Sequence, residues 1–209
     1  MNLYAYCANN PVNRWDPTGN DWLKIGLTIA SAAAIVGGIV LCATGFGGIA
    51  GGILLGAGAG SLISGYVNES NNGSFAGCWF GGLISGALCA AGAGLGGSLF
   101  VAATKTADIA AIGFLSASIG TSFAGGFLGN FVGSTVTSSI DGKSIDYGRL
   151  ALDSTFMGGL NVLAGFMSAI SSVSILMGKV ETNLNSKFAL RLLSGMIAGG
   201  TEVTYDFVS

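Results

Sequence analysis

The chain has 209 residues, of which 37 are glycine, 51% are hydrophobic and 9% are charged, whereas ordinary soluble domains carry about 25% charged residues. With a net charge of −2 and only eight Lys and Arg, the chain has no basic stripe for phosphates, so we expect no nucleic-acid partner. The absence of His excludes His-based acid–base catalysis and His metal sites, and we expect neither an enzyme nor a cofactor.

The cysteines are spaced too irregularly to predict a metal or redox site. Neither a CxxC pair nor a His at ligand spacing occurs. We therefore expect no metal, and we interpret the four cysteines as small buried hydrophobic residues: Cys7, Cys42, Cys78 and Cys89.

Residues 1–19 differ in composition from everything that follows, and we expect them to form a separate module. Alternation over residues 3–6 favours a short strand, and residues 9–11 and 16–19 favour two turns. The first 21 residues are polar and aromatic, with no basic start followed by an apolar run, so we expect no signal peptide in this chain.

Three motifs in this segment, NLYAY, NNPVN and DPTG, together resemble the C-terminal edge of the core domain of RHS (YD-repeat) proteins. The resemblance implies that residues 1–19 are a remnant of that core domain and that a variable effector follows. It also implies a parent protein whose repeats form a β-cage around the effector, and an immunity protein as a further partner.

Members of this family that cut themselves at the junction use a pair of DPxG motifs whose aspartates share a proton. This chain contains one copy, residues 16–19, followed by Asn20 where the family has a large aliphatic residue. The resemblance therefore implies that Asp16 is an unpaired remnant of a self-cleavage site. An ordinary Asp-Pro turn is the alternative.

A long charge-free stretch follows. The 44 residues from Ile25 to Asn68 contain no Asp, Glu, Lys or Arg, which is enough for two membrane spans of about 20 residues each. The TGFGG break at residues 44–48 predicts a turn between helices at 25–43 and 48–67. Later uncharged runs, at 70–104, 109–140 and 154–178, complete a predicted all-α fold of four or five helices within residues 20–178.

Glycines recur in these runs at intervals of four residues. Such rows let two helix backbones approach closely, and we predict that they form glycine zippers. Residues 45–65 hold nine glycines, and at about 1 kcal/mol each relative to Ala they oppose a water-exposed helix by about 9 kcal/mol. The predicted helix-packing residues are Gly48, Gly52, Gly56 and Gly60; Gly73, Gly77 and Gly81; and Gly125, Gly129 and Gly133.

The last segment, residues 179–209, mixes charges with apolar residues. We predict an amphipathic helix, either lying at an interface or packed as the last helix of a bundle. Threading five spans places basic residues on both sides of a membrane without a clear excess, so ordinary positive-inside insertion is not indicated.

Taken with the resemblance, these features predict a membrane-inserting, pore-forming effector region of an RHS-type polymorphic toxin. Its partners would be a lipid bilayer and further copies of itself, and it would act in the membrane of a target cell. Two alternatives remain open. The chain could be a hydrophobic translocation or spacer module for an enzymatic toxin that lies elsewhere, or a structural protein assembled through its glycine rows.

Overall fold

The computed structural model describes residues 21–43, 48–69, 74–106 and 109–176. Within this part of the chain every regular element is an α-helix, which confirms the all-α prediction there. The predicted strand and turns of residues 1–19 and the predicted tail helix of residues 179–209 lie outside the described residues. The helices are α1 (Asp21–Ala43), α2 (Gly48–Glu69), α3 (Phe75–Lys105), α4 (Ile109–Asp141) and α5 (Tyr147–Leu176).

The connection between α4 and α5 shows how local sequence sets the helix ends. Gly142 has a φ of 65°, a left-handed conformation that glycine adopts without steric cost. The N–H of Lys143 donates to the carbonyl of Ser138 at 2.9 Å, the hydrogen bond that closes a helix ending on such a glycine. The carboxylate of Asp146 then accepts from the N–H of Gly148 at 3.0 Å, so it caps the start of α5.

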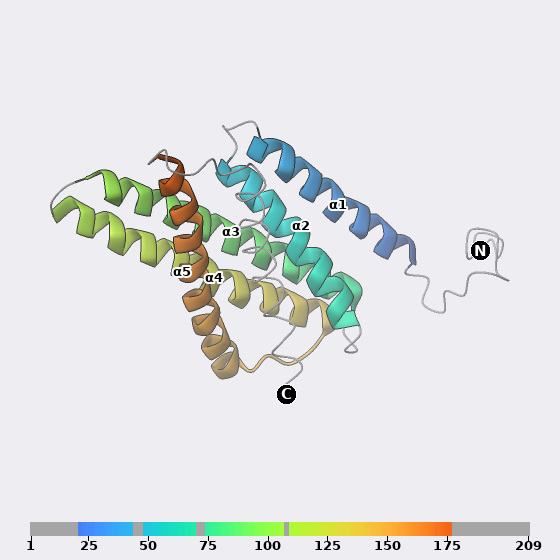
Figure 1. The fold of residues 1–209 in the computed structure, drawn as a ribbon. Coiled ribbons are helices and arrows are strands. Elements are labelled where there is room, and N and C mark those ends of the chain that lie inside the picture. Colours follow the sequence, from blue (N-terminus) through green and yellow to red (C-terminus); the bar gives the residue numbers. More distant parts are fainter. Residues whose placement is uncertain (1–20, 44–47, 70–73, 107–108, 177–209) are drawn as a thin grey trace, which may run out of the picture.

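The first four helices form two successive antiparallel hairpins, α1–α2 and α3–α4, which lie against each other through α2 and α3 (Figure 1). The helix α3 is the centre of the bundle because it packs against α2 on one side, α4 on another and α5 on a third. The last helix does not continue the pattern: α5 crosses the α3–α4 hairpin steeply (Figure 1).

Candidate functional site

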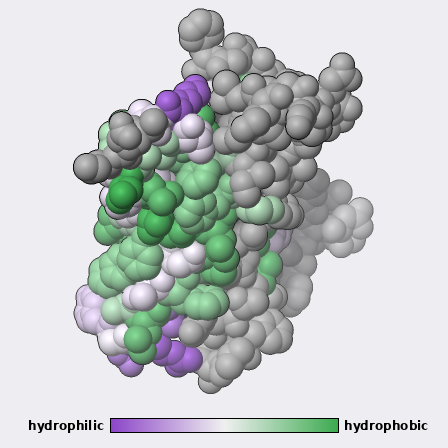
Figure 2. All heavy atoms as spheres, turned by 60° about the vertical axis from the view of Figure 1, so that its left-hand side comes forward, coloured by the Kyte–Doolittle hydropathy of each residue, from purple (hydrophilic) through white to green (hydrophobic). Residues whose placement is uncertain are grey.

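Large apolar side chains lie on the outside of the described helices. Trp22 and Ile29 of α1 are 67% and 64% exposed, Ile112 of α4 is 69% exposed, and Leu152 of α5 is 72% exposed. Figure 2 shows hydrophobic residues over most of the described part of one face, with hydrophilic residues at its upper and lower edges. All five helices are long and apolar enough to cross a membrane.

The interior has the opposite character. Its buried hydrophobic residues are mostly Ala and Cys, with Leu55, Trp79, Leu150 and Met157 as the larger exceptions. A protein that folds in water buries its large aliphatic residues and leaves Ser and Asn mainly outside, so the described bundle is inverted. Its buried polar residues are Ser31, Ser61, Ser64, Ser85, Ser118, Ser122, Asn130, Ser154 and Asn161.

Helices α2 and α3 touch through glycine backbones. A methyl group on Gly56 would lie 2.5 Å from the carbonyl oxygen of Gly86, and one on Gly60 would lie 2.5 Å from that of Gly82. Methyl groups on Gly82 and Gly86 would collide in turn with the backbone of α2. No side chain larger than hydrogen fits at these four positions without moving a helix.

The α3–α4 contact is built in the same way along a second face of α3. The Cα of Gly125 lies 2.5 Å from where a methyl group on Gly92 would be placed. A methyl group on Gly129 would lie 2.8 Å from the sulfur of Cys89, and one on Gly81 would lie 2.7 Å from the carbonyl oxygen of Gly133. The two helices therefore approach each other closely over most of their length.

Some of the glycines predicted to pack helices lie at these contacts, and others do not. Gly56, Gly60, Gly77, Gly81, Gly125 and Gly129 each have a neighbouring helix or side chain within contact distance, and the carbonyl of Gly133 contributes to one contact. Gly48 is half-buried, and Gly73 lies outside the described residues.

Gly52 has no close helix neighbour in the described bundle, because a methyl group there would meet nothing within 4 Å. A four-residue step advances about 40° around a helix, so a row that begins on an interface leaves it after one or two steps.

The prediction also missed a second row on α3. Gly82, Gly86 and Ala90 recur at the same interval and face α2, whereas Gly77 and Gly81 face α4. The signal was in the sequence, since the spacing is identical. Recognising it required knowing that α3 lies between two helices and needs two such faces.

Buried side-chain hydrogen bonds join α1, α2 and α3. The indole N–H of Trp79 donates to the hydroxyl of Ser31 at 2.7 Å, and the hydroxyls of Ser31 and Ser61 are 2.7 Å apart. The carbonyls of Leu27 and Gly58 lie 3.1 and 3.0 Å from the hydroxyls of Ser31 and Ser61, so one of the two hydroxyls donates to the other and the second donates to the carbonyl of its own helix. One residue from each helix thus enters a single connected network.

Asn161 joins α5 to both members of the α3–α4 hairpin. Its side-chain amide donates to the carbonyl of Ser122 at 2.7 Å and to that of Cys89 at 3.1 Å, and the residue is 6% exposed. About two helical turns away, the amide of Asn130 donates to the hydroxyl of Ser154 at 3.2 Å. Sequence reasoning missed these residues because an isolated Asn or Ser in an apolar run gives no indication of its partner.

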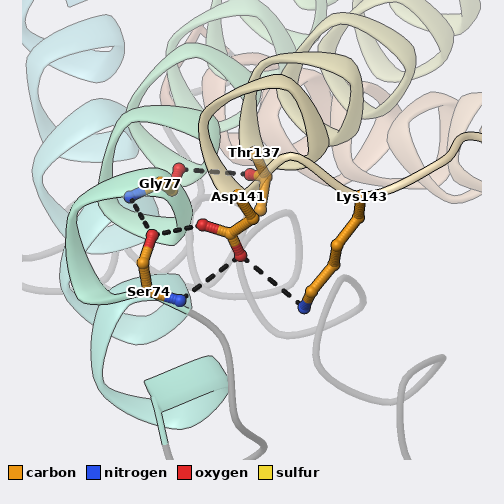
Figure 3. A network of polar contacts seen from close by, with 5 residues as sticks. All are labelled: Ser74, Gly77, Thr137, Asp141 and Lys143. Atoms are coloured by element: carbon orange, nitrogen blue, oxygen red, sulfur yellow. Dashed lines mark hydrogen bonds and ion pairs between the residues drawn. The ribbon is translucent and has the colours of Figure 1, made fainter.

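A polar cluster closes the end of the α3–α4 hairpin (Figure 3). Ser74 caps α3 by accepting from the N–H of Gly77 at 3.1 Å, and both its hydroxyl and its backbone N–H donate to the carboxylate of Asp141. Lys143 lies 3.6 Å from the same carboxylate, and the hydroxyl of Thr137 donates to the carbonyl of Gly77. The carboxylate is also well placed for the positive end of the α3 dipole.

The described residues contain no group of three or more His, Cys, Asp or Glu side chains that could hold a metal ion. Asp16 lies outside the described residues. Cys78 and Cys89 are 2% and 1% exposed within α3, as expected for small buried residues, and Cys42 of α1 is half-buried.

Comparison of the chain with protein-family models, with curated proteins and with solved structures finds no match.

Proposed function

We propose that this chain inserts its helices into a lipid bilayer and permeabilises it. The observation that carries the proposal is the inverted polarity of the bundle, with large apolar side chains outside and Gly, Ser, Ala and Asn inside. In hydrocarbon no hydrophobic force drives helices together, so close van der Waals packing of small residues and buried hydrogen bonds must hold them. Glycine zippers between α2 and α3 and between α3 and α4 would provide that packing.

The close contacts at glycine also limit where a water-filled pore could lie. Where Gly56 meets Gly86 and Gly92 meets Gly125, there is no room for a side chain, and therefore none for a water-filled path between those helices. A lumen within one copy of α2, α3 and α4 is thus disfavoured. The proposal accordingly includes a homo-oligomer whose pore lies between copies.

The biological setting comes from the resemblance of residues 1–19 to the RHS core domain. On that basis the helical region is the effector of an RHS-type polymorphic toxin, carried in the cage of a parent protein and delivered to a target-cell membrane. Such a cage would keep the exposed apolar side chains from water until release. A membrane-acting effector needs no catalytic residues, so the proposed toxin is not an enzyme.

The test is release of a small trapped dye from lipid vesicles by the full chain. We expect release at micromolar protein, together with oligomers that chemical crosslinking detects. Gly56→Leu should greatly reduce both signals, whereas Gly52→Leu, which has the same change in side chain and hydrophobicity, should behave like the wild type. Vesicles that stay intact with bound protein would refute permeabilisation. Protein that remains in solution as an oligomer would favour the structural assembly instead.

A further inference from the structure

The two ends of the bundle differ in chemistry. The starts of α1 and α3 and the ends of α2 and α4 lie together at one end, as contacts among Lys24, Tyr66, Phe75 and Asp141 with its partner Ser74 establish. We infer that the α1–α2 hairpin enters the bilayer with its turn leading, while Lys24, Tyr66 and Phe75 hold the opposite end in the lipid headgroup region. This inference rests on the proposed membrane insertion.

The distribution of charge determines which end can lead. Every residue from Ile25 to Asn68 is uncharged, so the turn between α1 and α2 can cross the hydrocarbon without carrying a charge into it. A Lys or Asp at the centre of a spanning helix costs about 2.5–3.5 kcal/mol on insertion scales. Among the described residues at the far ends of the helices only Lys105 is charged, and it belongs to α3.

The other end has the residues that prefer the boundary between lipid and water. The ammonium group of Lys24 lies 5.2 Å from the ring centre of Tyr66 and 5.3 Å from that of Phe75, and these two rings pack edge to face at 5.1 Å. The hydroxyls of Thr28 and Tyr66 are 2.9 Å apart. We call Lys24, Tyr66 and Phe75 the aromatic anchor. Aromatic residues with one polar tip and lysines with an apolar stem are favoured at the boundary between lipid and water.

Exposure around the aromatic anchor agrees with contact to headgroups. Tyr66 is 46% exposed and Trp22, two residues before Lys24, is 67% exposed. At the same end of the bundle Lys143 is exposed and pairs with Asp141. The ammonium of Lys143 is therefore at the surface, where it can stay hydrated after the hairpin has entered, while the Asp141 side chain, 4% exposed, is held by Ser74 and Lys143.

Burial indicates that α1 is the helix most exposed to lipid. In its apolar stretch 11% of the residues are buried, against 56% in α2. Its exposed residues Ile25, Ile29, Val36 and Val40 are spaced by four, seven and four positions, so they form one continuous face. A helix with one packed side and one apolar side fits the outer position of an inserted hairpin.

Topology can be tested with one reactive cysteine at each end of the hairpin. Leu23→Cys lies beside the aromatic anchor and Ile49→Cys beside the turn, and both side chains are exposed. Both variants are made with Cys7→Ser and Cys42→Ala, while Cys78 and Cys89 are retained because they are buried. The full chain is added to vesicles of mixed phosphatidylcholine and phosphatidylserine. A maleimide-dextran too large to follow the dye is supplied outside or preloaded inside.

We expect Leu23→Cys to react with the outside reagent and Ile49→Cys with the inside reagent. Adding Lys24→Gln should lower this preference about fivefold, because one basic residue near an anionic surface is removed; Lys105→Gln is the matched control and should not change it. Dye release with both cysteines labelled from outside, or with the two sides exchanged, would overturn the inference and leave the proposed function standing. Vesicles that neither bind the protein nor release dye would refute both.

Discussion

The α1–α2 and α3–α4 hairpins are made of similar residues but hold together differently. The α3–α4 hairpin has close glycine contacts at Gly92 and Gly125, and the carboxylate of Asp141 closes its end. The α1–α2 hairpin also packs through glycine, at Gly38 and Gly51, but 11% of the apolar stretch of α1 is buried among the described residues. Within the described bundle, α3 and α4 therefore form the framework and α1 is an outer helix.

The largest loss of stability should come from a substitution that forces the two hairpins apart at the α2–α3 contact. Gly86→Leu would push a side chain into the backbone of α2 at Gly56, and overpacking of this kind costs about 3 kcal/mol or more when helix backbones must move. We expect the free energy of unfolding in detergent to fall by that amount, with α2 becoming accessible to protease.

Gly52→Leu is the control for this change because the β-carbon added at Gly52 would meet nothing within 4 Å. We expect its stability to equal or slightly exceed that of the wild type, since a helix penalty of about 1 kcal/mol is removed. Equal losses in Gly86→Leu and Gly52→Leu would show that the close α2–α3 contact does not hold the hairpins together.

The next effect concerns the attachment of α5 to the framework. Asn161→Leu keeps a similar volume but removes the hydrogen bonds to the carbonyls of Ser122 and Cys89. Polar contacts between helices in lipid contribute about 0.6 to 2 kcal/mol, so we expect a loss near the upper end because two are removed. Urea unfolding followed by a label on α5 measures it. A label on α1 should report almost no change, and a uniform loss at both labels would contradict this assignment.

A smaller loss of stability is expected where the start of α3 meets the end of α4. Asp141→Asn keeps one acceptor oxygen for Ser74 but removes the ion pair with Lys143 and the negative charge at the start of α3. We expect a loss of about 1 kcal/mol: the Asp141 side chain is 4% exposed, but its partner Lys143 is 57% exposed and therefore screened by solvent, and Asn keeps a hydrogen bond to Ser74. Added salt should reduce the difference from the wild type. A difference that is independent of salt would assign the loss to hydrogen bonding alone.

The smallest change in stability should be a gain instead of a loss. The hydroxyl of Ser85 is fully buried and has no hydrogen-bond partner among the described atoms. Ser85→Ala removes a polar group that was not satisfied, so we expect stability to stay equal or to rise by up to about 1 kcal/mol. Ser61→Ala is the comparison and should be destabilising, because the hydroxyl of Ser61 is bonded to Ser31. A clear loss in Ser85→Ala would reveal a partner for that hydroxyl.

The positions of the first two helices were predictable from the uncharged runs, whereas α5 begins at Tyr147, seven residues before the predicted run at 154, and includes Arg149 and Asp153. The predicted helices at 25–43 and 48–67 correspond to α1 and α2 within a few residues. The spacing of a glycine row does not say which of its members touch a neighbouring helix. Gly56 and Gly60 lie against α3, whereas a methyl group on Gly52 would meet nothing within 4 Å, and this depends on how steeply the two helices cross.

The steep crossing of α5 was not predicted either. It depends on Asn161 reaching carbonyls in α3 and α4 and on Gly126 allowing α5 to approach, and these partners are 35 or more positions away from Asn161. Hydrophobic periodicity records which residues avoid water, but it does not specify long-range pairs. Polar groups buried singly in apolar helices are therefore the part of this fold that sequence reasoning leaves undetermined.

The unequal helix lengths have a consequence for the thickness of the membrane. With 23 and 22 residues, α1 and α2 are about 35 and 33 Å long, close to the roughly 30 Å of a typical hydrocarbon core. With 31 and 33 residues, α3 and α4 reach about 46 and 50 Å. A bilayer that α1 and α2 span upright can accommodate α3 and α4 only if they tilt, if their ends project into water, or if the lipid thickens around them.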